Sequence, residues 1–246
     1  MTESIIEIRG IFKVYPGADG GCQALADVNH RFRRGTLTSL LGPSGCGKTT
    51  LLKIIAGLLS ATQGEVWVKG QQVTAPGPDR AFVFQDFALL PWATTLRNVA
   101  FGLELRGVPK AKRFEIAHKY IEQVGLSGFE NNYPYELSGG MCQRVGLARA
   151  LTVDSEILLM DEPFGSIDEQ TRRKLQEDLL ELLDYTKKTV IFVTHSIEEA
   201  VYLSDQILLL TPRPGTVMEI IDPRIDRQNL SPDEVRRSQA LSLIHI

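Results

Sequence analysis

The feature that most constrains this chain of 246 residues is the glycine-rich segment Gly42–Thr49, which reads GPSGCGKT. It matches the pattern GxxxxGK[ST], in which a loop between a strand and a helix surrounds the phosphates of a nucleotide. Both neighbours are predicted, because Thr36–Leu41 is an apolar run typical of a buried strand and a helical pattern runs from about Lys48 to Leu59. A glycine-rich turn that matches by chance is the alternative, and this context disfavours it.

Each part of the segment has a role in binding phosphate. Glycines allow the backbone N–H groups to curl around the β-phosphate, and the positive end of the following helix points at the same place. Lys48 supplies a positive charge to the β- and γ-phosphates, and the Thr49 hydroxyl is a suitable Mg²⁺ ligand. The expected nucleotide-binding residues are Gly42, Pro43, Ser44, Gly45, Cys46, Gly47, Lys48, Thr49 and Thr50.

Polar residues follow two further predicted strands. The apolar run Ile157–Met160 leads into Asp161 and Glu162, and acids at the carboxyl end of a buried parallel strand lie where α/β sheets bind ligands. We expect Asp161 to organise Mg²⁺ and Glu162 to activate the attacking water; two plain surface acids are the alternative. His195 follows the strand Val190–Val193 and is interpreted as a contact to the γ-phosphate, against the alternative of a structural histidine.

Short strands alternate with helical patterns, which favours a mainly parallel sheet covered by helices. The other expected strands are Ala81–Phe84, Gln206–Leu210 and a hairpin of Glu65–Val68 with Gln71–Val73. Strand signals vanish between about Asp86 and Ser155, where three helices are expected: Leu96–Leu105, Lys110–Val124 and Gly140–Leu151. The predicted fold class is α/β, a P-loop NTPase with a mainly parallel core sheet, an antiparallel β part at the N-terminal side and an inserted helical subdomain.

Bulk properties narrow the setting. The net charge of −3 gives no reason to expect nucleic acid as a partner. No apolar run approaches the roughly 20 residues that span a bilayer, so any membrane attachment is expected through a partner protein. The cysteines, Cys22, Cys46 and Cys142, are far apart and are interpreted as structural thiols rather than as disulfide or metal ligands.

The segment Leu137–Met141, which reads LSGGM, resembles the LSGGQ signature of the ATP-binding cassette (ABC) family, and the resemblance covers nearly all of the chain. The signature is a second anion site, because Ser138 caps a helix and Gly139 and Gly140 let backbone N–H groups approach a phosphate. The resemblance implies ATP as the nucleotide and a head-to-tail dimer with two ATP molecules between the subunits. It also implies a single domain, 1–246, with an ATP-binding core (1–85 and 156–222), a helical subdomain (86–155) and a C-terminal tail (223–246).

The same resemblance assigns three further residues. Gln85 corresponds to the glutamine that senses Mg²⁺ and the γ-phosphate, Asp168 to a loop that acts across the dimer, and Tyr15 to an aromatic residue that stacks on adenine. Without the resemblance, Tyr15 would be interpreted as packing. The implied catalytic residues are thus Glu162, His195 and Gln85, and the implied Mg²⁺ ligands are Thr49, Gln85 and Asp161. The chain departs from the family pattern at Met141, at Ser196 and in the loop Ser166-Ile167-Asp168, but keeps every phosphate ligand.

Three segments are similar to the importer branch for nitrate, sulfonates, taurine and bicarbonate: Leu89–Trp92, Asn98–Leu103 and Arg213–Gly215. The expected function is therefore that of an ATP-hydrolysing importer subunit for a small anion, peripheral at the cytoplasmic face of the membrane. Its implied partners are a second copy of the chain, an integral membrane permease and, indirectly, a substrate-binding protein. The alternatives are a non-transport ABC ATPase acting on nucleic acid or the ribosome, and a regulatory module that binds nucleotide without turnover.

Overall fold

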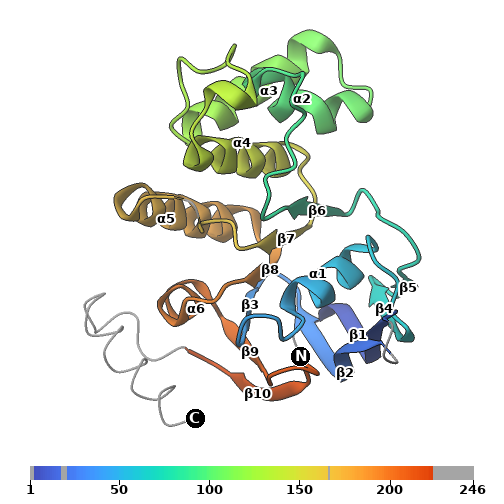
Figure 1. The fold of residues 1–246 in the computed structure, drawn as a ribbon. Helices are drawn as coiled ribbons and strands as arrows, with labels where there is room; N and C mark the ends of the chain where they lie inside the picture. The colour runs from blue at the N-terminus through green and yellow to red at the C-terminus, as the bar shows by residue number, and fades with distance from the viewer. Residues whose placement is uncertain (1–2, 18–20, 166, 224–246) are drawn as a thin grey trace. The chain divides into compact units, whose positions relative to one another are not determined.

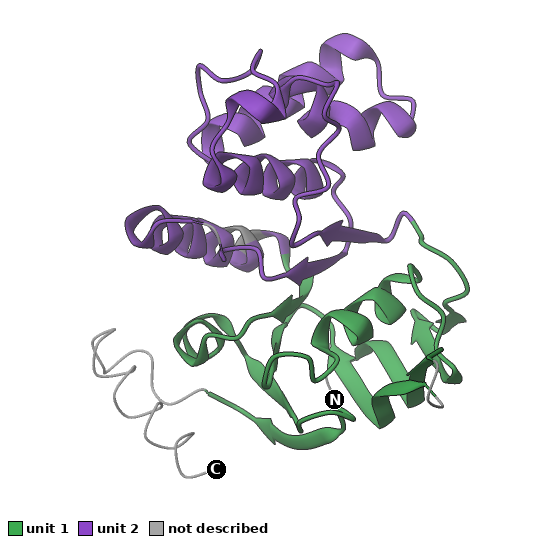
Figure 2. Cartoon of the chain, viewed as in Figure 1, with its two compact units in different colours: residues 1–77, 187–246 green, residues 78–186 purple. Residues whose placement is uncertain are grey.

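The computed structural model describes residues 3–17, 21–165 and 167–223. The chain clusters into two compact units, unit 1 (residues 1–77 and 187–246) and unit 2 (residues 78–186), which Figure 2 shows in green and purple. The predicted boundaries of the core and the helical subdomain stay predictions. The predicted tail, apart from residue 223, lies outside the described residues.

Unit 1 contains an antiparallel sheet with the strand order β2-β1-β4-β5. Its strands are β1 (Ser4–Tyr15), β2 (Cys22–Arg33), β4 (Gln63–Val68) and β5 (Gln71–Gln72). The predicted hairpin is β4 with β5, and its turn residues Lys69 and Gly70 have positive φ angles of 50° and 75°. A two-residue hairpin turn with positive φ at both positions matches the twist of the strands that it joins.

Four more strands of unit 1 are β3 (Leu37–Leu41), β8 (Thr189–Val193), β9 (Gln206–Leu210) and β10 (Val217–Ile221). β3 pairs in parallel with both β8 and β9, and β10 pairs antiparallel with β9. Every residue of β3 and β8 is buried, as expected for parallel strands covered on both faces. The helix α1 (Lys48–Ala56) contacts β8, and α6 (Ile197–Leu203) contacts β3 (Figure 1).

Unit 2 pairs β6 (Arg80–Val83) in parallel with β7 (Ile157–Asp161). Its helices are α2 (Thr95–Leu105), α3 (Lys110–Gln123), α4 (Gly139–Thr152) and α5 (Glu169–Thr186), with a short 3₁₀ turn, η1 (Pro134–Glu136). The helices α2, α3 and α4 contact one another (Figure 1). None of the helices in the described parts of the chain combines the length and the apolar character needed to cross a bilayer.

The predicted α/β fold class is confirmed, with an antiparallel sheet, parallel strand pairs and a helical segment between β6 and β7. The predicted strands and helices are present, with ends that differ by a few residues. The sequence patterns did not delimit β1, β2, β10 or α6. β1 illustrates the reason, because several register shifts in its pairing with β2 break the alternation that marks a strand.

His30 of β2 makes the stability of unit 1 sensitive to acid. Its Nε2 atom lies 3.1 Å from the side-chain oxygen of Gln206 in β9, and its ring packs edge-on against Phe32. Burial lowers the pKa of His30 to about 4, with a smaller contribution from the charge of Arg33. The unfolded chain binds this proton below about pH 6.5. Stability is therefore lost as the pH falls from about 6.5 to about 4.

We expect the free energy of unfolding to fall by about 2 kcal/mol between pH 7 and pH 5 because of His30. His30→Gln keeps a hydrogen-bonding side chain and removes this dependence. The measurement is urea unfolding at several pH values, with His118→Gln on the exposed face of α3 as the control. Equal acid sensitivity in the His30 variant and the wild type would contradict the assignment.

Candidate nucleotide-binding site

The phosphate loop joins β3 to α1 within unit 1. β3 ends at Leu41, and α1 begins at Lys48 after Gly47, which has a φ angle of 104°. A Cβ atom on Gly47 would lie 2.7 Å from Leu25 Cδ2 and 2.9 Å from the carbonyl oxygen of Ala24. Neither the conformation nor the space admits a side chain at this position. The glycine therefore lets the loop close against the start of β2.

Lys48 is held inside the loop. Its side chain is buried, and Nζ donates hydrogen bonds to the carbonyl oxygens of Gly42 at 2.7 Å and Pro43 at 3.0 Å. The N-terminus of α1 has no side-chain cap and no acidic residue in its first turn. A fixed ammonium beside an uncapped helix N-terminus is an arrangement that suits a polyphosphate.

The turn between β9 and β10 packs against the outside of the loop. Nε of Arg213 donates a hydrogen bond to the carbonyl oxygen of Gly45 at 3.1 Å. The Gly215 N–H donates to the carbonyl oxygen of Ala24 at 2.9 Å. A Cβ atom on Gly215 would lie only 2.1 Å from the carbonyl oxygen of Cys46. The turn thus supports the backbone of the phosphate loop.

We expect Gly215→Ala to weaken ATP binding about tenfold, because the new methyl group must displace the Cys46 carbonyl and with it the loop. Equilibrium titration with a fluorescent ATP analogue measures the change. Gly70→Asn is the control, because a Cβ at Gly70 meets no atom within 4 Å and asparagine tolerates its positive φ. Unchanged affinity in Gly215→Ala would show that the loop does not depend on this support.

Tyr15 lies at the end of β1 and reaches the first turn of α1. Its hydroxyl is 3.1 Å from Oγ1 of Thr50, so two of the predicted nucleotide-binding residues are in contact. The Lys13 ammonium lies 5.3 Å from the centroid of the Tyr15 ring and also donates to the carbonyl oxygen of Ser60 at 2.7 Å. The residue is 37% exposed, so part of it stays accessible to solvent.

His195 lies at the same edge of the sheet as the phosphate loop. The parallel register pairs Leu40 of β3 with Val193 of β8, so the residues after Val193 run beside the start of the loop. Thr194 fixes this segment by donating to the Glu199 carboxylate at 2.7 Å and accepting from the Ser196 N–H at 3.0 Å. His195 itself is exposed at the position predicted for a phosphate contact.

The predicted water-activating group lies in unit 2. β7 ends at Asp161, which is 2% exposed, and Glu162 follows it. Gln85 comes two residues after the parallel strand β6, and its Nε2 donates to Oε2 of Glu162 at 3.4 Å. Glu162 has a φ angle of 47°, a left-handed conformation that costs a non-glycine residue about 1–2 kcal/mol. Two of the predicted catalytic residues are thus in contact.

The signature segment begins α4 as predicted. Ser138 is the N-cap residue, and its Oγ accepts a hydrogen bond from the Met141 N–H at 3.3 Å. The cap uses the backbone N–H of Met141 and not its side chain. Methionine in place of the glutamine of the LSGGQ pattern therefore leaves the cap intact. A Cβ at Gly139 would meet no atom within 4 Å, which shows open space beside the helix N-terminus.

Asp168 lies at the start of α5 and is exposed. Its carboxylate accepts a hydrogen bond from the Thr171 N–H at 3.0 Å. Hydrogen bonds from the backbone and side chain of Thr171 lower the pKa of Asp168, so the group is charged at neutral pH. Asp168 therefore caps α5. This capping role does not depend on any role of Asp168 across a dimer.

The predicted residues fall into groups within each unit. Unit 1 holds the phosphate loop with Tyr15, Thr50 and His195, and unit 2 holds Gln85 with Asp161 and Glu162. The signature residues begin α4 of unit 2. The predicted Mg²⁺ ligands are divided, with Thr49 in unit 1 and Gln85 and Asp161 in unit 2. Hydroxyl, amide and carboxylate oxygens fit Mg²⁺.

Comparison with known proteins decides the family. Residues 25–165 match the family described as ABC transporter. The chain belongs to the ABC transporter family. It is also 51% identical over 222 residues to an uncharacterised ABC transporter ATP-binding protein of Methanocaldococcus jannaschii, which covers 90% of this chain and 83% of that protein. The taurine import ATP-binding protein TauB of Escherichia coli strain K12 is 48% identical over 200 residues, 81% of this chain and 78% of TauB.

Solved ABC cassettes share the fold. The dimeric structure of a bacterial ABC transporter cassette has a TM-score of 0.82 and 33% identity, covering 89% of this chain and 99% of that one. The same cassette in a post-hydrolysis state bound to ADP and phosphate has a TM-score of 0.80 and 32% identity. The predicted family and the predicted activity, that of an ABC-type ATPase, are therefore confirmed.

Several residues around the ABC site were not predicted from motifs. Gln143 and Arg149 of α4 contact the loops that carry Glu162 and Gln85. Arg213 belongs to the importer-like segment Arg213–Gly215, and its hydrogen bond to the phosphate loop is an additional feature that this resemblance does not predict. The sequence around Gln143, Arg149 and Arg213 carries no pattern that marks these contacts with distant backbone groups.

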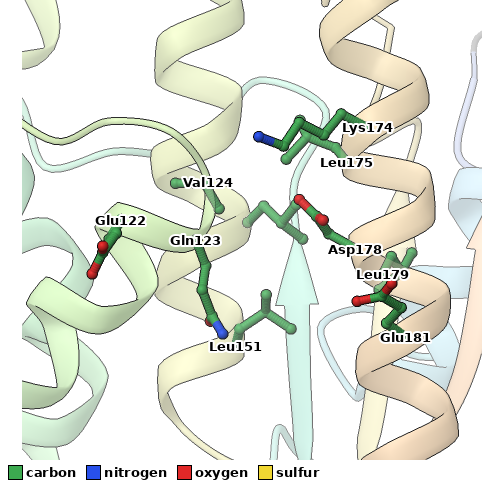
Figure 3. A pocket seen from close by; sticks show the side chains of 10 residues that line it. Glu122, Gln123, Val124, Leu151, Lys174, Leu175, Asp178, Leu179 and Glu181 are labelled. Atoms are coloured by element: carbon green, nitrogen blue, oxygen red, sulfur yellow. The ribbon is translucent and has the colours of Figure 1, made fainter.

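Unit 2 also contains a cavity of about 480 Å³ lined by α4, α5 and the end of α3 (Figure 3). Its apolar lining includes Leu147, Leu151, Leu175 and Leu179, and its polar lining includes Lys174 and Asp178. None of the predicted nucleotide-binding or catalytic residues lines it. The cavity therefore shares no lining residue with the predicted nucleotide-binding and catalytic groups.

Proposed function

We propose that this chain is the ATPase subunit of an ABC importer for a small anion, with taurine and related sulfonates as the first candidates. The observation that carries this proposal is the 48–50% identity to taurine import ATP-binding proteins over 81% of the chain. Nitrate and bicarbonate are further candidates from the importer-like segments Leu89–Trp92 and Arg213–Gly215. The subunit acts at the cytoplasmic face of the membrane through a permease, with a separate substrate-binding protein delivering the anion.

ATP binding is assigned to unit 1. The phosphate loop surrounds the β-phosphate with N–H groups, Lys48 neutralises the β- and γ-phosphates, and Tyr15 stacks on adenine. The buried Lys48 ammonium and the uncapped N-terminus of α1 support these assignments. Thr49, Gln85 and Asp161 are assigned to Mg²⁺, which when bound neutralises charge on the β- and γ-phosphate oxygens.

Hydrolysis is assigned to Glu162, His195 and Gln85. The Glu162 carboxylate accepts a proton from the water that attacks the γ-phosphorus, the bond from that atom to the β,γ-bridging oxygen breaks, and ADP and phosphate leave. Gln85 orients the carboxylate and the water, and its 3.4 Å contact with Glu162 supports this. His195 is placed to bind the γ-phosphate. Positioning and charge stabilisation provide most of the catalysis.

Two copies of the chain are proposed to close head to tail around two ATP molecules. Each active site then uses the phosphate loop of one subunit and the Ser138, Gly139 and Gly140 N–H groups of the other. The open space beside Gly139 supports this arrangement, and the similar cassette has a dimeric structure. Asp168 acts across the same interface. Closure moves the segment after Gln85, which contacts the permease.

The transport proposal is tested by pairing this chain with a candidate permease and a candidate substrate-binding protein from the same organism. The three proteins are placed in vesicles with ATP inside, and uptake of labelled taurine, nitrate and bicarbonate is measured. ATP-dependent uptake of one anion, lost in Glu162→Gln, is the expected result. Hydrolysis that no anion stimulates and no uptake above the Glu162→Gln level would reject the importer.

A further inference from the structure

Two loops that carry proposed catalytic side chains have backbone conformations that their residues disfavour. Glu162 has a φ angle of 47°, and Phe87 and Ala88, just after Gln85, have φ angles of 59° and 46°. Non-glycine residues avoid this region because Cβ comes too close to the following carbonyl oxygen. Such conformations persist where surrounding contacts determine them, and they gather at functional sites. Specific contacts must therefore hold both loops.

The contact at Glu162 comes from α4. Gln143 is 2% exposed, and its Nε2 donates a hydrogen bond to the main-chain oxygen of Glu162 at 2.9 Å. The Gly165 N–H donates to the same oxygen at 3.2 Å. These two donors fix the main-chain oxygen of Glu162 and thereby hold the backbone that carries the carboxylate.

The contact at the loop after Gln85 also comes from α4, nearly two turns further along. The guanidinium of Arg149 donates to the carbonyl oxygens of Phe87 at 2.8 Å and Ala88 at 2.7 Å. Burial lowers the pKa of Arg149, although the group stays charged. Charge-assisted hydrogen bonds to two successive carbonyls form a rigid, two-point attachment.

We propose that α4 positions the hydrolytic groups of its own subunit, with Gln143 as the positioning residue for Glu162 and Arg149 as that for the Gln85 loop. This inference rests on the proposed roles of Glu162 and Gln85. α4 begins with the signature residues Ser138–Gly140, so the helix assigned to the partner's ATP also holds the base of its own site. Small displacements of a reacting group lower rates steeply, which makes the attachments catalytically important.

The primary test is Gln143→Met in the full chain, which keeps the side-chain length and removes the donor. We expect kcat for ATP hydrolysis to fall about tenfold, with KM and ATP affinity within about twofold of wild type. Thr152→Val is the matched control, because Thr152 is buried on the same helix and donates to backbone oxygens of Val99 and Arg149. The control is expected to lose thermal stability but to keep kcat.

Two double variants separate positioning from packing. In the Glu162→Gln background, Gln143→Met is expected to cause no further loss in single-turnover hydrolysis, because Gln143 acts through the Glu162 side chain. Arg149→Met is expected to lower kcat about tenfold, and adding Ala88→Gly is expected to restore part of it, since glycine adopts a φ angle of 46° without strain. General destabilisation would give additive losses and no rescue.

The outcomes distinguish this inference from the proposed function. If Gln143→Met keeps the wild-type kcat while Glu162→Gln is inactive, the positioning role of Gln143 is overturned and the role of Glu162 as the base stands. Normal hydrolysis in Glu162→Gln overturns the base and the positioning role with it. Equal losses of kcat in Gln143→Met and Thr152→Val also overturn the inference, because packing of α4 would then explain both.

Discussion

Glu162→Gln is expected to bind ATP like the wild type and to hydrolyse it about a thousandfold more slowly in the steady state. The substitution keeps the size and polarity of the side chain and removes the group that accepts the proton. Gln85 Nε2 now contacts a carboxylate oxygen of Glu162, and the new amide keeps one oxygen for this contact. The phosphate loop with Lys48 and Tyr15, to which ATP binding is assigned, lies in unit 1, whereas Glu162 lies in unit 2.

Phosphate release under saturating ATP measures the rate, and titration with a fluorescent ATP analogue measures the affinity. Glu177→Gln, an exposed acid on α5, is the control and is expected to hydrolyse ATP normally. A Glu162→Gln variant with more than about a tenth of the wild-type rate would contradict the assignment, because a general base contributes at least about a hundredfold.

Lys48→Met is expected to weaken ATP binding at least about a hundredfold, or about 3 kcal/mol. The variant loses the charge assigned to the phosphates and also the hydrogen bonds from Nζ to the Gly42 and Pro43 carbonyl oxygens. Lys48→Arg is expected to fail as well, because the buried site holds a compact ammonium and not a planar guanidinium.

Isothermal titration of ATP measures the Lys48 effect directly. Lys53→Met, in the last turn of the same helix, is the matched control and is expected to keep wild-type affinity. Thermal unfolding of each variant shows whether the helix is still folded. Affinity within about threefold of wild type in Lys48→Met would remove Lys48 from the binding site.

Much of the fold could be predicted because its signals are local. The strands β3, β7 and β8 are buried along their whole length, and each leads into predicted site residues at its carboxyl end. The parallel pairing of β6 with β7 brings Gln85 and Glu162, which follow these strands, into contact. Patterns of this kind depend only on strand order and burial.

The remaining features depend on contacts between distant residues. The edge strand β10 exposes Met218 and Ile220, so it lacks the buried pattern of the central strands. Left-handed conformations at Glu162, Phe87 and Ala88 have no sequence signal, because none of these residues is glycine. In the sequence, Gln143 and Arg149 are ordinary helix residues. Only the structure shows that they donate hydrogen bonds to the main-chain oxygens of Glu162 and Phe87.

The central claim is that two copies of this 27.3 kDa chain close around ATP through the phosphate loop and the signature residues. Sedimentation of Glu162→Gln with and without ATP tests it most directly, since slow hydrolysis preserves the closed state. The account predicts a monomer without ATP, a dimer with ATP, and no dimer after Gly139→Asp is added to block the signature. A Glu162→Gln chain that binds ATP and still sediments as a monomer at saturating ATP would contradict it.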